Sequence, residues 1–201
     1  MNLTVLGAAG ATGTLLVGQA LAADHQVTAL VRSPEKLTVT NPNLHVIQGD
    51  ATDRAALSRA MKEAGALIST LGAAGPVIGE AARAIVAVAK QDGPERIVML
   101  SSFAVARDRL TPASKLLTRM AMGAQIKDKT AGEEALRASG LDWTIVYATK
   151  LTNGPKTEPR VVPETAKVGV SQKVSRAAVA SFLLQAATDS LYSRRAVIIT
   201  G

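Results

Sequence analysis

The sequence has no cysteine in 201 residues, and this absence excludes several kinds of site at once. Without thiols there is no disulfide framework, no thiolate metal ligand and no cysteine nucleophile. Aromatic residues make up only 2% of the chain, so the stacking platforms of single-strand nucleic-acid binders are scarce. Zinc-finger spacing and RNA-binding signatures are also missing. We therefore expect neither a metal centre nor a nucleic-acid partner.

Long hydrophobic runs are missing as well. No uninterrupted apolar run reaches the ~18 residues of a transmembrane helix. The first apolar stretch has no basic segment before it and ends at Gly7, which is not the pattern of a signal peptide. Together with the lack of cysteine, these features favour a cytoplasmic protein that has no membrane partner.

Short apolar runs do alternate with helical patterns along the whole chain. The runs predicted to be strands are 3–6, 26–31, 44–48, 66–70, 95–101, 141–147 and 196–200. The helical patterns are 12–22, 53–63, 77–90, an interrupted stretch over 112–139, and 175–188. Thr52 is expected to cap the second helix, and Thr111 with Pro112 to open the fourth.

Several predicted strands are apolar at consecutive positions, as in 97–100, which indicates burial on both faces. Strand–helix alternation with short connections implies right-handed crossovers. We predict an α/β fold: one Rossmann-type domain over 1–201, with a doubly wound, mostly parallel sheet and helices on both faces. Residues 148–174, rich in proline and glycine, are expected to form an irregular loop region on the substrate side.

The first predicted strand runs directly into the segment Gly-Ala-Ala-Gly-Ala-Thr-Gly (7–13), which opens the first helix. Glycines there permit a tight turn, a close approach of backbone to a pyrophosphate, and close packing of helix on strand. The helix N-terminus offers free N–H groups to phosphates. The spacing differs from the common G-x-G-x-x-G, and the alternative is an ordinary tight turn. The context favours a dinucleotide site at Gly7, Gly10, Ala11, Thr12 and Gly13.

A basic residue stands where NAD-selective sites carry an acid. There, Asp or Glu ends the second strand and holds the ribose 2′-OH, but this chain has Arg32, with Lys36 shortly after. A guanidinium forms paired hydrogen bonds to a 2′-phosphate, which a carboxylate would repel. Arg32 and Lys36 therefore predict NADP(H), the alternative being a surface arginine. Asp50, after the third strand, either bonds the adenine amino group or only starts a turn.

Other predicted cofactor contacts also follow strand ends, where ligands bind in this class of sheet. They are Ala51, Leu71, Gly72, Ser101, Tyr147 and Ala148. The hydroxyl of Ser101 or Ser102 either orients nicotinamide or substrate, or satisfies local backbone groups. Trp143 and Tyr147 are four residues apart on one strand, so they share a face and are also expected in the core.

These motifs resemble the atypical short-chain dehydrogenases/reductases, and within them the small NAD(P)H-binding branch related to NmrA-like proteins and biliverdin reductase B/flavin reductase. Besides the glycine loop, the resemblance rests on segments 31–37, 48–50, 97–102, 138–146, 151–155 and 175–180. The family's Tyr-x-x-x-Lys pair aligns with Gln125 and Lys129, so the phenol is missing. Its Arg-Pro-Gly after the sixth strand is replaced by Tyr147-Ala148-Thr149. Catalysis by a phenolic acid is therefore not expected.

The resemblance implies an NADPH-dependent oxidoreductase that passes hydride to a flavin, tetrapyrrole or quinone-like acceptor, because such acceptors do not require the phenol. Ser102, Lys129 and Lys150 are the catalytic candidates. Lys129 would bond the nicotinamide ribose and Lys150 an anionic substrate; otherwise both are solvated lysines. The alternative function is a non-catalytic NADP(H) sensor of NmrA-like type. A sugar-nucleotide epimerase or dehydratase is disfavoured by the missing tyrosine.

The net charge of +7 lies entirely in the second half. Residues 1–100 carry 8 Lys/Arg and 8 Asp/Glu, whereas residues 101–201 carry 15 and 8. The excess gathers in 107–129 and 150–176, which border the substrate pocket in related folds. Such a rim suits an anionic or conjugated small molecule, the alternative being a generic basic surface. We expect a monomer or a small homo-oligomer.

Overall fold

Parallel strands form the centre of the molecule, in the order β3-β2-β1-β4-β5-β6-β10-β8. Only the last pair, β10 with β8, is antiparallel. The computed structural model describes residues 1–72, 77–163 and 165–201. The strands of this sheet are β1 (Asn2–Leu6), β2 (Gln26–Val31), β3 (Leu44–Gln48), β4 (Ala66–Ser69), β5 (Arg96–Ser102), β6 (Asp142–Ala148), β8 (Arg160–Val161) and β10 (Arg195–Thr200). The strand order reverses direction between β1 and β4, which creates a crevice at their carboxyl ends.

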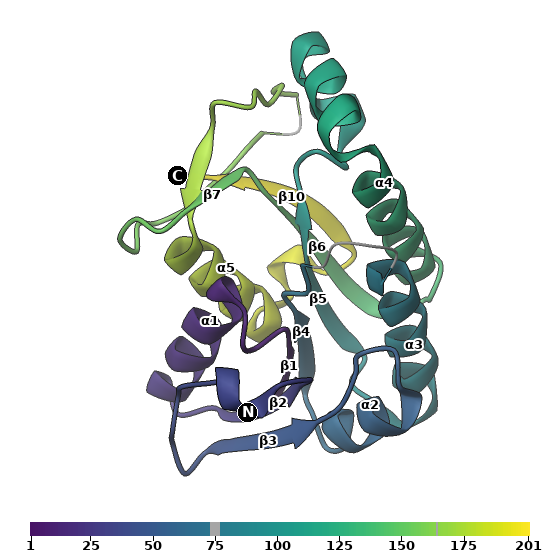
Figure 1. Cartoon of the computed structure of the whole chain (residues 1–201), viewed down its shortest axis with the longest axis vertical. Coiled ribbons are helices and arrows are strands. Elements are labelled where there is room, and N and C mark those ends of the chain that lie inside the picture. Colours follow the sequence, from purple (N-terminus) through teal and green to yellow (C-terminus); the bar gives the residue numbers. More distant parts are fainter. Residues whose placement is uncertain (73–76, 164) are drawn as a thin grey trace.

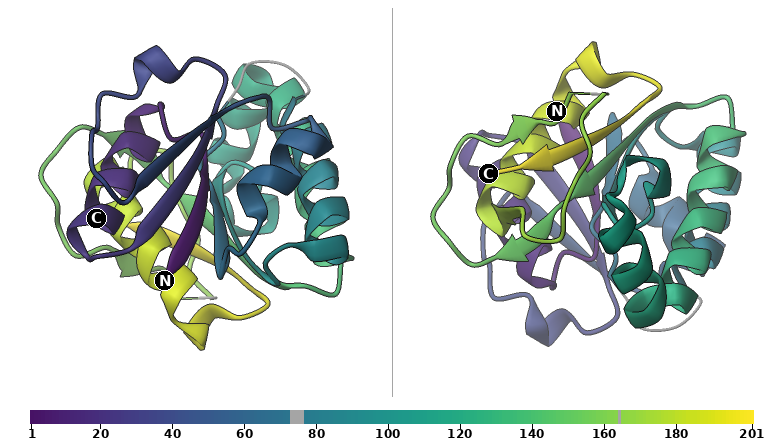
Figure 2. Two further views of the ribbon diagram at one scale, coloured as in Figure 1. Left: turned by 90° about the horizontal axis from the view of Figure 1, so that it is seen from below. Right: turned by 90° about the horizontal axis from the view of Figure 1, so that it is seen from above.

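Helices cover both faces of the sheet, as the apolar strands require. They are α1 (Ala11–Ala22), α2 (Arg54–Met61), α3 (Val77–Asp92), α4 (Pro112–Arg137) and α5 (Arg176–Thr188), with 3-10 turns η1 (Pro34–Lys36), η2 (Arg107–Arg109) and η3 (Ser190–Tyr192). Figure 1 shows α1 and α5 on one side of the sheet and α2, α3 and α4 on the other, and Figure 2 shows the same layers from two further directions. The predicted doubly wound α/β fold is confirmed.

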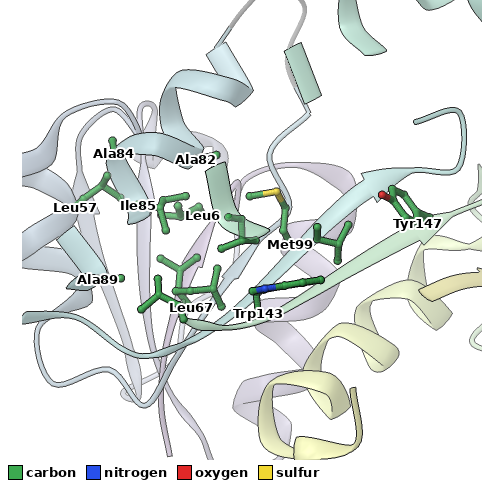
Figure 3. Packing of buried hydrophobic residues seen from close by; sticks show 14 of the residues in the cluster. Leu6, Leu57, Leu67, Ala82, Ala84, Ile85, Ala89, Met99, Trp143 and Tyr147 are labelled. Carbon is green, nitrogen blue, oxygen red and sulfur yellow. The ribbon is translucent and has the colours of Figure 1, made fainter. Parts of the chain in front are cut away.

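Each face of the sheet has its own apolar core, because successive strand residues point to opposite faces. On the α2–α4 side, Leu67, Ile97, Trp143 and Tyr147 pack into one cluster, and Figure 3 shows Tyr147 at its far end from Leu57. The other cluster joins strand residues such as Val98 to α1 and α5. Trp143 and Tyr147 thus share one buried face, as expected from their spacing.

Three details differ from the sequence-based expectations. Asp53, not Thr52, caps α2, because its carboxylate accepts a hydrogen bond from Ala55 N. The fourth helix is continuous, since Gly132 packs against α3 where a larger residue would meet the Ala82 methyl group at 3.1 Å. The 148–174 region contains short strands: β8 extends the main sheet, and β7 (Lys150–Thr152) pairs in parallel with β9 (Lys173–Ser175).

An ion pair between buried Arg96 and half-buried Asp142 joins the amino ends of β5 and β6, at the edge opposite the crevice. Arg96 is 8% exposed and donates to Asp142 Oδ1 at 3.0 Å and to Thr144 Oγ1 at 2.7 Å. Its Nε also donates to the carbonyl of Ala186 in α5, at 3.1 Å. Burial lowers the pKa of Arg96, which Asp142 counteracts. This one side chain therefore ties two strands to a helix.

Candidate functional site

A cleft of about 980 Å³ opens at the carboxyl ends of the parallel strands. Most of the residues predicted to form the site line it: Gly7, Gly10, Ala11, Thr12, Arg32, Lys36, Asp50, Ala51, Leu71, Gly72, Ser101, Ser102, Lys129, Ala148 and Lys150. Gly13 and Tyr147 do not. The topology thus brings together residues from β1 to β7 that are up to about 140 positions apart in the sequence.

The glycine loop is a turn that tolerates no side chain at two of its positions. Gly7 has φ +77°, and a Cβ there would lie 2.8 Å from Thr70 Oγ1. A Cβ on Gly13 would lie 2.1 Å from the Gly7 carbonyl oxygen. Gly13 therefore contributes by letting α1 approach the loop, although it does not line the cleft. Thr70 Oγ1 donates to the Leu6 carbonyl at 3.0 Å and ties β4 to the base of the loop.

Helix α1 begins at this loop without a side-chain cap, because its N-cap residue is Gly10. Within the described part of the chain, the N–H groups of Ala11, Thr12 and Gly13 have no hydrogen-bond acceptor. Free N–H groups at a helix N-terminus suit a phosphate group. The glycine loop and these free N–H groups form a cradle that fits the pyrophosphate of a dinucleotide in both shape and charge.

Basic side chains follow the second strand at one end of the cleft. Arg32 and Lys36 are both exposed and line it. In the described ranges no carboxylate lies within ion-pair distance of either. Asp50 instead builds a turn: its Oδ1 accepts from Thr52 N at 2.9 Å and from Thr52 Oγ1 at 2.8 Å. These two hydrogen bonds lower the pKa of Asp50, and the charge of Arg32 lowers it further.

The opposite end of the cleft is basic as well. Lys129, Lys150 and Arg176 line it, so five of the six charged side chains in the described lining are basic, with Asp50 the exception. Burial lowers the pKa of Lys129, against the charges of Glu133 and Asp128. Arg176 opens α5 and donates to Asn153 Oδ1 at 2.6 Å. Arg176 was not among the predicted site residues, although its place at the start of a helix was.

No phenol lines the cleft among the described residues. Gln125, which stands in the position of the family's tyrosine, is exposed on α4 and does not line the cleft. Tyr192 packs on Phe182, with ring centroids 5.1 Å apart. Tyr147, which was predicted to contact the cofactor, does not line the cleft, because it shares the α4-facing side of β6 with Trp143. Only Ala148, on the other face of β6, reaches the cleft.

The two serines at the end of β5 have different partners. Ser102 Oγ accepts from Ala104 N at 3.3 Å, so its hydroxyl serves the local backbone. Ser101 faces α4, and its Oγ donates to Glu133 Oε1 at 2.7 Å. Glu133 is only 4% exposed and also accepts a hydrogen bond from the Tyr147 hydroxyl. Burial raises the pKa of Glu133, and these two hydroxyls and nearby positive charges only partly offset this.

Glu133, a buried titratable residue that contacts the cleft-lining Ser101, was not among the residues predicted from the sequence. Its partners lie 32 and 14 positions away, so no local motif reveals them. One signal exists: Glu133 and Lys129 are four residues apart on a helix and hence share a face. Asp128 on the same helix caps α3, accepting from Ile78 N at 2.9 Å and Gly79 N at 3.0 Å. This cap fixes α4 against the wall of the cleft.

Comparison with known proteins identifies the family. Residues 7–190 match the model of the NAD(P)H-binding family. The chain belongs to the NAD(P)H-binding family. The match includes the glycine loop, and the predicted dinucleotide cofactor of the NAD(P)H type is thereby confirmed.

Curated relatives of this NAD(P)H-binding chain include an enzyme of Streptomyces griseus, (4-alkanoyl-5-oxo-2,5-dihydrofuran-3-yl)methyl phosphate reductase. It is 35% identical over 142 residues, which are 71% of this chain and 45% of the relative. Averufin oxidase A of Aspergillus flavus is 36% identical over 103 residues, 43% of this chain and 36% of the relative. The matches therefore span less than half the length of these relatives.

Solved structures share the fold of this NAD(P)H-binding protein. A short-chain dehydrogenase/reductase of Veillonella parvula, solved with NADP, has a TM-score of 0.87 at 23% identity, over 100% of this chain and 94% of that chain. An anaerobillin reductase of Escherichia coli O157:H7 has a TM-score of 0.85 at 24% identity, over 99% and 96%. Across the described residues, no helix combines the length and apolarity needed to cross a membrane.

Proposed function

We propose that this protein is an NADPH-dependent reductase of a conjugated acceptor such as a flavin, a tetrapyrrole or a quinone-like compound. The observation that carries the proposal is the composition of the cleft. It presents a phosphate cradle and Arg32 at one end, and Lys129, Lys150 and Arg176 without a phenol at the other. A conjugated acceptor spreads the charge it gains, so it needs positioning more than a phenolic acid.

Arg32 and Lys36 account for the preference for NADPH over NADH. Both bind the 2′-phosphate, Arg32 through its planar fork and Lys36 as a point charge. Free N–H groups at the start of α1 hold the pyrophosphate. When bound, the reduced nicotinamide supplies a hydride. The other end of the cleft orients the acceptor, and both ends belong to the single domain over 1–201.

Two relatives support the acceptor class. The Streptomyces enzyme is named for an unsaturated lactone that carries a phosphate ester, and the E. coli enzyme for a bilin-type compound. Both acceptors are conjugated. The basic rim of Lys150 and Arg176 suits the phosphate or carboxylate groups of such compounds.

Turnover of NADPH with a panel of acceptors tests the proposal. FMN, riboflavin, biliverdin and soluble quinones are each mixed with the protein, and the loss of NADPH absorbance is followed. We expect at least one acceptor to be reduced, with NADPH preferred to NADH. If none is reduced, the proposal is wrong.

FMN and riboflavin share a ring system and differ in the phosphate, so they test the basic rim directly. Lys150→Ala should lower kcat/KM for FMN about three- to tenfold and leave riboflavin unchanged, because about one exposed charge pair is lost. Lys156→Ala is the matched control, since Lys156 is exposed on the same loop region and does not line the cleft.

The second candidate function is an NADP(H) sensor without catalysis. The lack of a phenol in the described cleft lining favours it as much as it favours phenol-free reduction. Tight NADPH binding with no turnover of any acceptor would support the sensor and exclude the reductase.

A further inference from the structure

A buried chain of hydrogen bonds links the cleft to a second cavity. From the cleft, Ser101 Oγ bonds to Glu133 Oε1 at 2.7 Å, and Glu133 Oε2 bonds to the Tyr147 hydroxyl. Arg137 Nη2 then donates to the same Tyr147 hydroxyl at 3.2 Å. The Arg137 guanidinium lies over the Trp143 ring, 4.8 Å from its centroid, and is exposed. The chain therefore runs from the cleft through the protein interior to a surface residue.

The second cavity has a volume of about 330 Å³ and shares no described lining residue with the cleft. Glu133, Tyr147 and Arg137 all line it. Ser101, by contrast, lines the cleft. Three hydroxyl or carboxyl groups in hydrogen-bond contact thus form a continuous polar path between two separate cavities. Such a path permits proton transfer without any movement of the backbone.

We propose that Ser101 gives a proton to the acceptor in the cleft, and that Glu133 replaces this proton and recovers its own from the second cavity through Tyr147. This inference rests on the proposed reductase function. Ser101 is then the residue that donates the proton to the acceptor. Glu133 and Tyr147 act through Ser101, because they resupply its proton.

The environment of Glu133 suits a carboxyl group that holds a proton. In the described ranges it has no ion-pair partner, and its two hydrogen-bond contacts are with neutral hydroxyls. A hydroxyl can donate or accept, so when Glu133 carries a proton its Oε1 donates to Ser101 Oγ while its Oε2 accepts from Tyr147. The titratable groups that face it are Lys129 and Arg137 on its own helix and Tyr147 on β6. Burial dominates over all three and raises the pKa of Glu133. A buried carboxyl that holds a proton is a suitable general acid.

The reaction balances with one proton per turnover. The dinucleotide supplies a hydride, that is, two electrons and one hydrogen nucleus. The Ser101 O–H bond breaks as its proton moves to the reduced acceptor, and the Glu133 proton moves to Ser101 Oγ. Tyr147 donates its proton to the Glu133 carboxylate while it accepts one from water in the second cavity, so no tyrosinate forms. The net reaction adds the hydride and one solvent proton to the acceptor.

The choice of acceptor separates proton supply from hydride transfer. Hydride addition to a quinone or biliverdin gives a basic anion that takes up a proton at neutral pH, whereas reduced FMN is a weakly basic anion that is stable without that proton. Glu133→Gln keeps the shape of the side chain but has no proton to give. We expect it to slow reduction of a quinone or biliverdin about a hundredfold or more, and to change FMN reduction and the NADPH Kd less than about twofold.

Glu134→Gln is the matched control, because Glu134 is the next residue on α4, is exposed, and only lines the second cavity. Ser101→Ala should reproduce the effect of Glu133→Gln. The wild-type rate with quinone should fall as pH rises through the pKa of Glu133, and this dependence should disappear in Glu133→Gln. Equal slowing of FMN and quinone would show a structural defect and overturn the relay.

A second measurement does not depend on turnover. Infrared difference spectra between wild type and Glu133→Gln, taken below the pH at which the wild-type quinone rate falls, should show the C=O band of a protonated carboxyl in the wild type, shifted in Tyr147→Phe. If the band is missing, Glu133 is ionised and the relay is refuted. If the wild type shows the band but reduces no acceptor, the proposed reductase function is wrong, whereas the protonated state of Glu133 is still demonstrated.

Discussion

Replacing Arg32 with alanine is expected to weaken NADPH binding much more than NADH binding. Arg32 lines the cleft after β2, and among the described residues no acid pairs with its guanidinium. A hydrogen bond to a charged partner contributes about 1.5–3 kcal/mol. Because Arg32 is exposed, we take the lower half of that range, which corresponds to about a ten- to fiftyfold increase in the NADPH Kd.

Titration calorimetry with both dinucleotides measures this effect directly. NADH lacks the 2′-phosphate, so its Kd should change less than about twofold. Arg32→Lys keeps the charge but loses the planar fork, and it should fall between wild type and Arg32→Ala. Higher ionic strength should shrink the difference, since the contact is exposed. If Arg32→Ala weakens NADPH and NADH equally, or neither, the assignment of Arg32 to the 2′-phosphate is wrong.

Three further predictions concern the glycine loop, the Arg96 ion pair and the pKa of Glu133. Gly13→Ala should abolish NADPH binding and lower the melting temperature, because its Cβ would lie 2.1 Å from the Gly7 carbonyl; Gly18→Ala on the same helix has open space and should stabilise by about 0.5–1 kcal/mol. Arg96→Met should cost about 3 kcal/mol in urea unfolding with an unchanged NADPH Kd, since Arg96 lies at the edge opposite the cleft. The raised pKa of Glu133 means that the native state keeps a proton that the unfolded chain loses. Wild-type stability should therefore fall relative to Glu133→Gln as pH rises above the ordinary carboxyl range, and unchanged differences between pH 4 and 8 would contradict the raised pKa.

The fold and the cofactor end of the site could be predicted because local sequence encodes them. Gly13 is required by its contacts with Gly7 and Ala8, and Gly7 by its own φ of +77°, so the motif itself carries this geometry. Arg32 is placed by the end of its strand, a position that parallel topology always brings to the crevice. Buried strands with consecutive apolar residues similarly identify a sheet that helices cover on both faces.

The substrate end could not be predicted in the same way, because tertiary contacts decide it. Alternation along β6 places Tyr147 on the α4 side, and only the packed structure shows that Glu133 meets it there. The continuity of α4 also depends on packing, since Gly132 has low helix propensity but fits closely against α3. The helix or strand that contains each of these residues could be predicted from sequence patterns. The residue that each one contacts could not, because it lies on an element far away in the sequence.

Under the proposed reductase function, the basic lining of the cleft has a consequence for the exchange of cofactor between turnovers. Oxidation of NADPH places a positive charge on the nicotinamide ring, so the dinucleotide that leaves is one unit less negative than the one that entered. Lys129, Lys150 and Arg176 lie at the end of the cleft opposite Arg32. They would repel the oxidised ring but not the neutral reduced one. We therefore expect the field of the cleft to favour exchange of spent for fresh cofactor after each turnover, without a conformational change dedicated to product release.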